Sequence, residues 1–454
     1  MSREPAAFLD DDALLRLHER HPGRYPALLE SVGGPPNLGR YDVLLALPGE
    51  RLQLQADGRL DEASPRAANQ HQFLPALDAW WRAERSHAGP PGVEPFAGGW
   101  FIYLGYELAQ EIEPRVHLPR SNHARALAWR MHGAIVRDRV TGAVVLHAES
   151  GAAERLRSEL QADLAALPAT TNYPARDQAL DVEEEPAEVF LRGVERILEA
   201  IGRGDVYQAN LSRGWFAPRP AGRSASDLYR RLRDANPAPF SGIARLPGFT
   251  LLSSSPERLV RVRGRTASTR PIAGTRPRGD SVATDARLRT ELQLNEKERA
   301  EHVMLVDLER NDLGRICRGG SVQVDEYMTI ETYATVHHIV SNVRGELRDG
   351  VTPGETIAAM FPGGTITGCP KVRCMELLAE VEGTPRDAYT GSMGYLGCDG
   401  SLDLNILIRT LAVSERGIEF RTGAGIVADS RPEFELAETR AKARGLLRAL
   451  GSEA

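Results

Sequence analysis

The sequence contains few cysteines, and their spacing argues against a disulfide framework or a zinc site. Its 454 residues include only Cys317, Cys369, Cys374 and Cys398, and no two of them form a Cys-x-x-Cys pair. Isolated cysteines of this kind are typical of free thiols in a reducing compartment. We therefore expect a cytoplasmic protein without disulfide bonds.

The chain also lacks long apolar runs and a large excess of charge of either sign. No apolar stretch approaches membrane-spanning length, and residues 1–5 contain no apolar signal core. The formal net charge is −6, which gives no reason to expect nucleic acid or an anionic membrane as a partner. Apolar residues make up 42% of the chain, enough for a large core in one multilayer domain or about two or three ordinary ones.

Lysine is unusually scarce. Only three of the 56 basic residues are lysine, namely Lys297, Lys371 and Lys442, and the others are arginine. Codon bias accounts for most of this preference. All three lysines nevertheless lie inside the densest motifs, where a compact ammonium group is not interchangeable with a planar guanidinium. Their placement supports a site at those motifs.

The sequence pattern of the first 165 residues predicts short strands and turns. Segments 41–46 and 51–54, separated by Pro48-Gly49, predict one hairpin, and segments 134–136 and 143–146 predict another. Stretch 98–106 predicts an apolar strand whose glycines let another backbone approach closely.

A polar, proline-bearing stretch at 166–188 indicates a linker to a larger region, 189–452. In that region Phe190, Val194 and Ile197 have helical spacing, and further strands alternate with long helices. This mixture of hairpins and helices favours an α+β layered sandwich over a regular βαβ array.

Two expected helices carry paired carboxylates one turn apart. Glu298 and Glu301 form one pair, and Glu435 and Glu438 form the other, in a helix that we expect Ser430 and Glu433 to cap. Such pairs repel unless a cation lies between them. Either pair alone is more typical of a solvated face, but together they suit magnesium, which binds one or two carboxylates directly and keeps its other oxygen ligands.

Three further segments carry candidate groups. Gly363 and Gly368 have phosphate-loop spacing, but Pro370 occupies the lysine position and has no N–H, so we reject nucleotide binding there. His337 and His338 are adjacent on an expected strand, so at most one should reach a pocket. Glu257 ends another strand, where it is either part of a turn or a general acid.

Taken together, the segments 204–211, 255–257, 271–278 and 363–371 and the two acidic helices resemble the chorismate-utilising enzymes. This family includes anthranilate, aminodeoxychorismate, isochorismate and salicylate synthases. The resemblance covers roughly residues 190 to 450 and implies a four-layer α/β/β/α sandwich with largely antiparallel sheets. It also implies that chorismate binds in a cleft over Mg²⁺.

The resemblance assigns roles by position. Glu301 and Glu438 would bind the metal directly, with Glu298 and Glu435 acting through water. Glu257 would protonate the departing ring hydroxyl. Catalytic positions would further include Gln208, Ala273, His338 and Thr365. The substrate would be held by Gly274, Thr275, Tyr395, Arg409, Gly423, Ala424, Gly425 and Lys442.

The reaction is expected to be amination. Isochorismate-forming members resemble one another in a lysine base where this chain has Gln208, which suits enzymes that add ammonia. Segments 207–211 and 361–368 resemble aminodeoxychorismate synthase component I, the reading we favour. Ala273 instead resembles anthranilate synthase component I, because many aminodeoxychorismate synthases carry a nucleophilic lysine there.

The resemblance also implies binding partners. The chain shows no glutaminase nucleophile elbow, so a separate glutamine amidotransferase subunit would supply the ammonia. Leu29, Glu30 and Ser31 resemble the tryptophan pocket of the family, although an ordinary helix end explains them equally well. A catalytically silent homologue that only binds chorismate or tethers an amidotransferase is the alternative from another class.

Overall fold

The computed structural model describes residues 10–34, 38–61, 70–85, 95–149, 151–167, 179–220, 222–333 and 336–452. Its helices are α1 (Ala13–Arg20), α2 (Phe73–Glu84), α3 (Ala109–Ile112), α4 (Ala153–Ala165), α5 (Ala187–Gly202), α6 (Ala225–Ala235), α7 (Val282–Leu294), α8 (Glu296–Gly314), α9 (Pro353–Met360), α10 (Lys371–Glu382) and α11 (Pro432–Leu450), with 3₁₀ turns η3 (Tyr106–Leu108) and η4 (Gly364–Ile366). Its strands are β1 (Ala27–Glu30), β2 (Tyr41–Leu54), β3 (Gly99–Leu104), β4 (Ala126–Asp138), β5 (Val144–Ala148), β6 (Glu183–Glu184), β7 (Gln208–Ala217), β8 (Phe240–Leu246), β9 (Phe249–Ser255), β10 (Arg258–Arg263), β11 (Thr266–Thr269), β12 (Ile272–Pro277), β13 (Gln323–Thr332), β14 (Val336–Glu346), β15 (Gly368–Cys369), β16 (Ser392–Gly397), β17 (Leu402–Asn405), β18 (Thr410–Ser414) and β19 (Ile418–Ile426).

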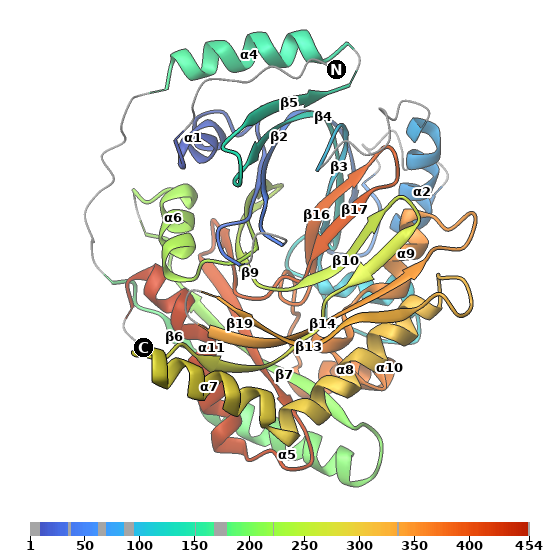
Figure 1. The fold of residues 1–454 in the computed structure, drawn as a ribbon, viewed down its shortest axis with the longest axis vertical. Helices are drawn as coiled ribbons and strands as arrows, with labels where there is room; N and C mark the ends of the chain where they lie inside the picture. Colours follow the sequence, from blue (N-terminus) through green and yellow to red (C-terminus); the bar gives the residue numbers. More distant parts are fainter. Residues whose placement is uncertain are drawn as a thin grey trace.

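The fold is α+β, as expected, with helices outside and antiparallel strands inside (Figure 1). One apolar cluster contains no helical residue and lies between strand layers, where Val43, Phe101 and Leu251 meet. Two further clusters pack helices against the outer faces of the strands. Helices α2 and α9 contribute to one, and α1, α4, α6 and α11 to the other. The order helix, sheet, sheet, helix follows from these clusters.

Strand β3 shows why its sequence is apolar throughout. Trp100 and Ile102 face the cluster that contains α2, whereas Phe101 and Tyr103 face the cluster between the sheets. Alternate residues of a strand point to opposite faces, so a strand between two layers is buried on both sides. At Gly99 another backbone approaches the strand closely, as expected for this segment. A Cβ there would lie 2.0 Å from the carbonyl oxygen of Leu396.

Strands of the N-terminal and C-terminal regions are hydrogen-bonded to one another. Strand β1 pairs with β8, with Leu28 opposite Ile243, and β3 pairs with β16, with Phe101 opposite Tyr395. Helix α4 ends at Ala165 and α5 starts at Ala187, while the expected region boundaries at 165 and 189 stay a prediction. Residues 168–178 of the expected linker lie outside the described residues.

The hairpin expected around Pro48-Gly49 is wrong. Residues 41–54 form one long strand, β2, which pairs with β4 on both sides of a register shift between Pro48 and Arg51. The proline and glycine therefore make a bulge and do not reverse the chain. The second expected hairpin, β4–β5, is confirmed.

The expected cap of the last helix is also wrong. Helix α11 begins at Pro432 with Arg431 as its N-cap and no side-chain cap. Ser430 Oγ instead accepts a hydrogen bond from the backbone N–H of Val427, at 3.0 Å, and so stabilises the preceding turn.

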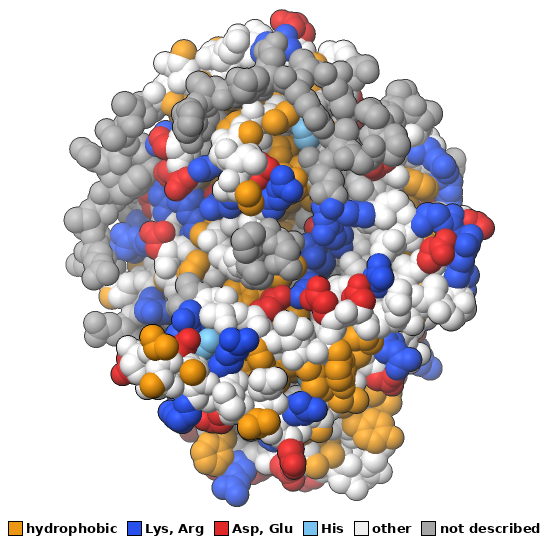
Figure 2. All heavy atoms as spheres, viewed as in Figure 1, with side chains coloured by type: hydrophobic (Ala, Val, Ile, Leu, Met, Phe, Trp, Pro, Cys, Tyr) orange, Lys and Arg blue, Asp and Glu red, His pale blue; other side chains and the backbone are white. Residues whose placement is uncertain are grey.

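Basic and acidic side chains are interspersed on the face of the molecule shown in Figure 2. Among the described residues, no helix is both long enough and apolar enough to cross a membrane. All four cysteines are free.

A buried ion pair holds together the elements around β7. Arg386 Nη2 lies 2.7 Å from Glu382 Oε1 on α10, and both side chains are 2% exposed. The same guanidinium donates to the carbonyl oxygens of Asn210 on β7, at 2.6 Å, and Ile366 in η4, at 3.3 Å. One cation therefore neutralises a buried carboxylate and fixes three segments.

We expect Arg386→Met to destabilise the protein by about 3–5 kcal/mol, because it leaves Glu382 buried without its counter-charge. Urea unfolding followed by circular dichroism measures the change. Arg373→Met is the matched control, since Arg373 forms a more exposed pair with Glu376 on the same helix, and it should cost about 0–1 kcal/mol. Equal effects of the two substitutions would contradict this role of Arg386.

Candidate active site

Two paired strands form one wall of the candidate site. Gly425 on β19 lies opposite Asn210 on β7, and a Cβ on Gly425 would come 2.7 Å from Gln208 Nε2. A Cβ on Gly423 would come 2.6 Å from the hydroxyl of Tyr389. Glycine at both positions lets neighbouring side chains and a ligand approach the backbone closely.

Lys442 connects this wall to α11. Its Nζ donates to the carbonyl oxygen of Gly423 at 3.0 Å and lies 2.7 Å from Glu438 Oε1. Burial works to lower the pKa of Lys442, but the neighbouring carboxylate of Glu438 raises it overall. The ammonium group therefore keeps its charge beside the glycine-rich strand.

Glu257 is a buried carboxyl group between β9 and β10. It is 6% exposed, and Thr365 Oγ1 in η4 donates to its Oε1 at 2.8 Å. Burial raises its pKa to about 7, opposed by the Thr365 hydrogen bond and by the charges of Lys442 and Arg409. The residue therefore exchanges its proton near neutral pH, as a general acid requires.

His338 lies on β14 beside β12. Its Nδ1 is 2.9 Å from Thr275 Oγ1 and 3.3 Å from the carbonyl oxygen of Gly274. Burial, followed by the charge of Arg409, lowers the pKa of His338 to about 3, so the imidazole is neutral. His337 points the other way, to Asp285 on α7 at 3.0 Å, which confirms that the two histidines face opposite sides.

Arg409 stands just before β18 with a left-handed backbone, φ 51°. Its Nη1 donates to Asn236 Oδ1 at 3.4 Å. Burial lowers the pKa of its guanidinium, and the carboxyl of Glu257 opposes this shift. Arg409 and Lys442 therefore both influence Glu257, from different elements.

The two acidic helices bring their carboxylates close together. Burial raises the pKa of Glu301 to about 7, and the charges of Glu298, Glu438 and Glu435 contribute. Glu301 on α8 and Glu438 on α11 are therefore close enough to repel. A Cβ on Gly274 would lie 2.8 Å from Glu298 Oε2, which places the acidic group beside β12.

The donor set fits a cation that keeps several waters. Among the described residues, no three acidic, histidine or cysteine side chains stand ready as a complete cage. Three of the four carboxylates are paired with a cation: Glu298 with Arg276 at 3.1 Å, Glu438 with Lys442, and Glu301 with Lys297 at 3.9 Å. Magnesium typically binds through one or two carboxylates plus waters and substrate oxygens, which this arrangement can provide.

Position 273 carries no reactive group. Ala273 is buried on β12 opposite Ile339, and Gly274 follows at a register shift with φ +67°. The bulge turns the backbone of Gly274 toward Glu298 and His338. A covalent intermediate cannot form at the alanine side chain.

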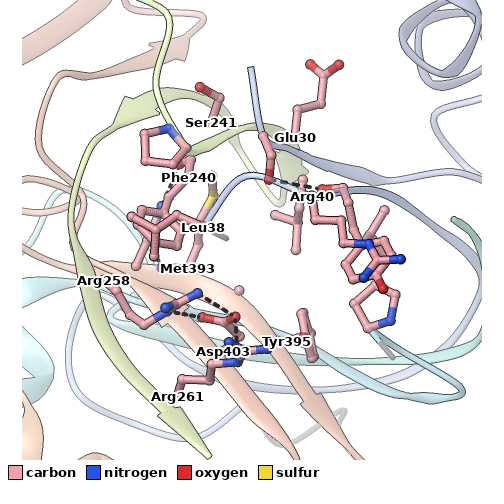
Figure 3. A pocket seen from close by; sticks show the side chains of 18 of the residues that line it. Glu30, Leu38, Arg40, Phe240, Ser241, Arg258, Arg261, Met393, Tyr395 and Asp403 are labelled. Atoms are coloured by element: carbon pink, nitrogen blue, oxygen red, sulfur yellow. Dashed lines mark hydrogen bonds and ion pairs between the residues drawn. The ribbon is translucent and has the colours of Figure 1, made fainter. Parts of the chain in front are cut away.

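Tyr395 does not join these residues. It lines a separate pocket of about 290 Å³ with Leu29, Glu30 and Ser31 (Figure 3). The carboxylate of Glu30 turns away from this cavity and accepts a hydrogen bond from Tyr229, at 2.7 Å. The geometry therefore separates the sequence-predicted residues into two sites.

Two residues of the candidate site were not predicted from the sequence. Tyr389 lies beside Gly423, and its hydroxyl accepts from Asn210 Nδ2 at 3.4 Å. Asn210 stands in the segment 204–211 that was singled out, whereas no singled-out segment contains Tyr389. Only the positions of β7 and β19 show that Tyr389, and not Tyr395, faces this wall.

The chain was compared with known proteins. The family model for chorismate binding enzymes matches residues 40–448. Aminodeoxychorismate synthase component 1 of Bacillus subtilis is 40% identical, covering 94% of this chain and 92% of its own length. Anthranilate synthase component 1 of Geobacillus stearothermophilus is 39% identical, covering 93% and 88%.

A solved structure agrees. Anthranilate synthase component I from Streptococcus pneumoniae superposes with a TM-score of 0.76 at 29% identity, covering 90% of this chain and 92% of its own. With a family match over most of its length, the chain belongs to the chorismate binding enzymes.

Proposed function

We propose that this protein replaces the 4-hydroxyl of chorismate with an amino group, giving 4-amino-4-deoxychorismate and water. The observation that carries the proposal is the buried acid Glu257, which lies within the influence of both Lys442 and Arg409 and beside the acidic helices. An acid between two cations suits a dicarboxylate whose ring hydroxyl must be protonated before it leaves. The relative from Bacillus subtilis, named aminodeoxychorismate synthase component 1, supports this choice.

Glu257 would supply the proton. The C–O bond of the ring hydroxyl breaks as Glu257 donates to the oxygen, and water departs. A C–N bond forms with ammonia, and the proton that its nitrogen then loses returns to the Glu257 carboxylate. Thr365 holds the Glu257 carboxyl in place through its 2.8 Å hydrogen bond and stabilises the carboxylate that results.

The cations would hold the two substrate carboxylates. Arg409 suits bidentate binding of one carboxylate, and Lys442 offers a point charge beside the Gly423 backbone. Neutral His338 and Thr275 supply hydrogen-bonding groups that add no charge.

Magnesium would be held by Glu301 and Glu438, with Glu298 and Glu435 acting through water. Bound there, it would neutralise a substrate carboxylate and so make ring chemistry easier. Gln208 lies on the β7–β19 wall beside Gly425 and would face the incoming ammonia, because its neutral amide cannot act as the base that activates water.

The second candidate function is anthranilate synthesis. Ala273 favours it, because the position has no amine to attack the ring before ammonia. Ammonia would then attack a ring carbon directly while the ring hydroxyl leaves as water, and elimination of pyruvate would give anthranilate. Relatives at similar identity carry both names.

Ammonia would come from a separate glutamine amidotransferase subunit. The relatives are named as component 1 of their synthases, which supports a second component. None of the four cysteines supports a glutaminase site in this chain, since burial raises the pKa of Cys317, Cys374 and Cys398 to about 11 or 12.

We expect the isolated chain to convert chorismate with ammonium and magnesium but not with glutamine. Chromatography identifies 4-amino-4-deoxychorismate directly, and adding the lyase that releases 4-aminobenzoate confirms it. Fluorescent anthranilate as the product would instead establish the second candidate function. Chelating magnesium should abolish turnover.

A folded protein that shows no magnesium-dependent turnover of chorismate would be the silent homologue. Equal use of glutamine by the isolated chain would refute the separate amidotransferase. Ala273→Lys is the matched variant, and it tests whether a covalent route is recoverable at this position.

The pH dependence should report on Glu257. A group with a pKa of about 7 keeps its proton below pH 7 and loses it above, so kcat should fall as pH rises through 7 at constant free ammonia. Thr365→Val removes a hydrogen bond that favours the carboxylate, which should move the fall about one pH unit higher. Thr365→Ser should restore the wild-type profile, and Glu257→Gln should lower kcat by about 10²–10⁴. An unchanged profile in Thr365→Val contradicts this assignment.

The second pocket is proposed to bind tryptophan. Leu29, Glu30 and Ser31 line it together with apolar Phe240 and Met393, which suits an amino acid with a large apolar side chain. This pocket lies outside the candidate active site, so tryptophan bound in it would leave that site open to the substrate.

Calorimetry should detect one tryptophan-binding event per chain. Leu29→Trp should abolish the heat because its own indole fills the cavity. Val140→Trp, at a position that is 63% exposed, is the control and should bind normally. Absence of heat in a sample shown to contain no bound tryptophan would remove the hypothesis.

A further inference from the structure

Tyr333 packs against His338, the histidine of the candidate active site. It follows β13 and precedes β14, and its side chain is buried. Its ring meets the ring of His338 edge-on, with centroids 5.4 Å apart and planes at 69°. Edge-to-face contacts between such rings favour a fixed relative orientation.

The hydroxyl of Tyr333 is anchored to a buried ion pair. It donates to Glu331 Oε2 at 2.7 Å, and the other oxygen of Glu331 lies 2.5 Å from Arg270 Nη2. Both charged side chains are 8% exposed. Burial, followed by the charge of Glu331, raises the pKa of the Tyr333 phenol well above its usual value. The phenol therefore remains a donor, and hydrogen bonds to a buried charge are strong.

The Tyr333 backbone and ring are fixed on other sides. Its N–H donates to the carbonyl oxygen of Val336 at 2.8 Å, and its own carbonyl accepts from Arg278 Nη1 at 3.0 Å. A Cβ on Gly34 would lie 3.2 Å from Tyr333 Cε1, so the segment after β1 covers the ring edge. The ring has little room to rotate.

The hydrogen bonds of His338 do not by themselves fix the tilt of its ring. Thr275 and Gly274 contact only its Nδ1. Gly274 offers a carbonyl oxygen, which can only accept, so the contact favours a proton on Nδ1 and an unprotonated Nε2. These contacts set the tautomer, but a hinge at one nitrogen leaves the ring free to tilt.

We propose that Tyr333 is a positioning residue that holds the His338 imidazole at the angle the reaction needs, with its own ring anchored by Glu331 and Arg270. The inference rests on the proposed chorismate activity of the site. Tyr333 touches no reacting atom and acts through His338.

A double-mutant cycle tests the proposal. Tyr333→Phe keeps the ring but removes the anchor, and we expect kcat to fall about tenfold with KM for chorismate changed less than about twofold. In a His338→Ala background the same substitution should change kcat less than about twofold, because there is no imidazole left to position. Tyr327→Phe is the control on β13, since Tyr327 is 54% exposed, and it should leave kcat unchanged.

A second measurement does not need activity. In protein with ¹³C-labelled histidine rings, the His338 signal is assigned by its loss in His338→Ala. Tyr333→Phe should shift that signal, because the ring current of residue 333 changes when the anchor is lost, and Tyr327→Phe should not.

Equal losses of kcat in the two backgrounds, or an unmoved His338 signal in a folded Tyr333→Phe protein, overturn the inference. A wild-type protein that does not convert chorismate refutes the proposed function instead, and the histidine signal then decides the positioning role alone.

Discussion

The site depends on burying charged groups of both signs next to one another. Glu257 is surrounded by protein, and its carboxyl is influenced by Lys442 and Arg409. Isolated charges in such surroundings are costly, whereas paired ones are tolerated when the geometry is good. The two cations lower the free-energy cost of ionising Glu257, whereas burial raises that cost. The opposing effects leave a pKa near neutrality, which makes proton donation and recovery both accessible.

The antiparallel sheet supplies the rigidity that this balance requires. The pairing of β7 with β19 brings Asn210 opposite Gly425, and the pairing of β12 with β14 brings Thr275 opposite His338. Each pair is far apart in the chain but fixed within a strand spacing. Side chains on strands are positioned more accurately than those on loops, so small charge separations can be maintained.

The candidate site and the second pocket are linked by short segments. Asn236 accepts a hydrogen bond from Arg409, while Pro239 and Phe240, a few residues further on, line the pocket. A Cβ on Gly34 would lie 3.2 Å from both Pro239 and Tyr333. The same short segments therefore contact groups from both sites, although no predicted substrate residue other than Tyr395 lies in the second pocket.

The sequence by itself determined the family and the α+β class, and it identified the side chains on which the proposed chemistry rests. Motifs such as Glu257 after a strand and paired glutamates on helices are local, and local spacing is visible in a sequence. Two of the three lysines follow the same logic, because Lys297 lies one helical turn from Glu301 and Lys442 one turn from Glu438, whereas Lys371 meets Asp312 only through the fold. The absence of an amine at position 273 was also visible in the sequence, because it depends on the identity of one residue.

Only the tertiary structure decided which residues share a site. Tyr389 and Tyr395 stand six positions apart, yet Tyr389, in the turn before β16, lies beside Gly423, whereas Tyr395, on β16, lines the second pocket. Pro48-Gly49 makes a bulge because β4 continues to pair on both sides of it, a long-range constraint that local turn preferences do not contain. The support of His338 by Tyr333 likewise depends on the pairing of β13 with β14 and on a buried ion pair. Local spacing determines residue chemistry, whereas strand register and packing determine which groups meet.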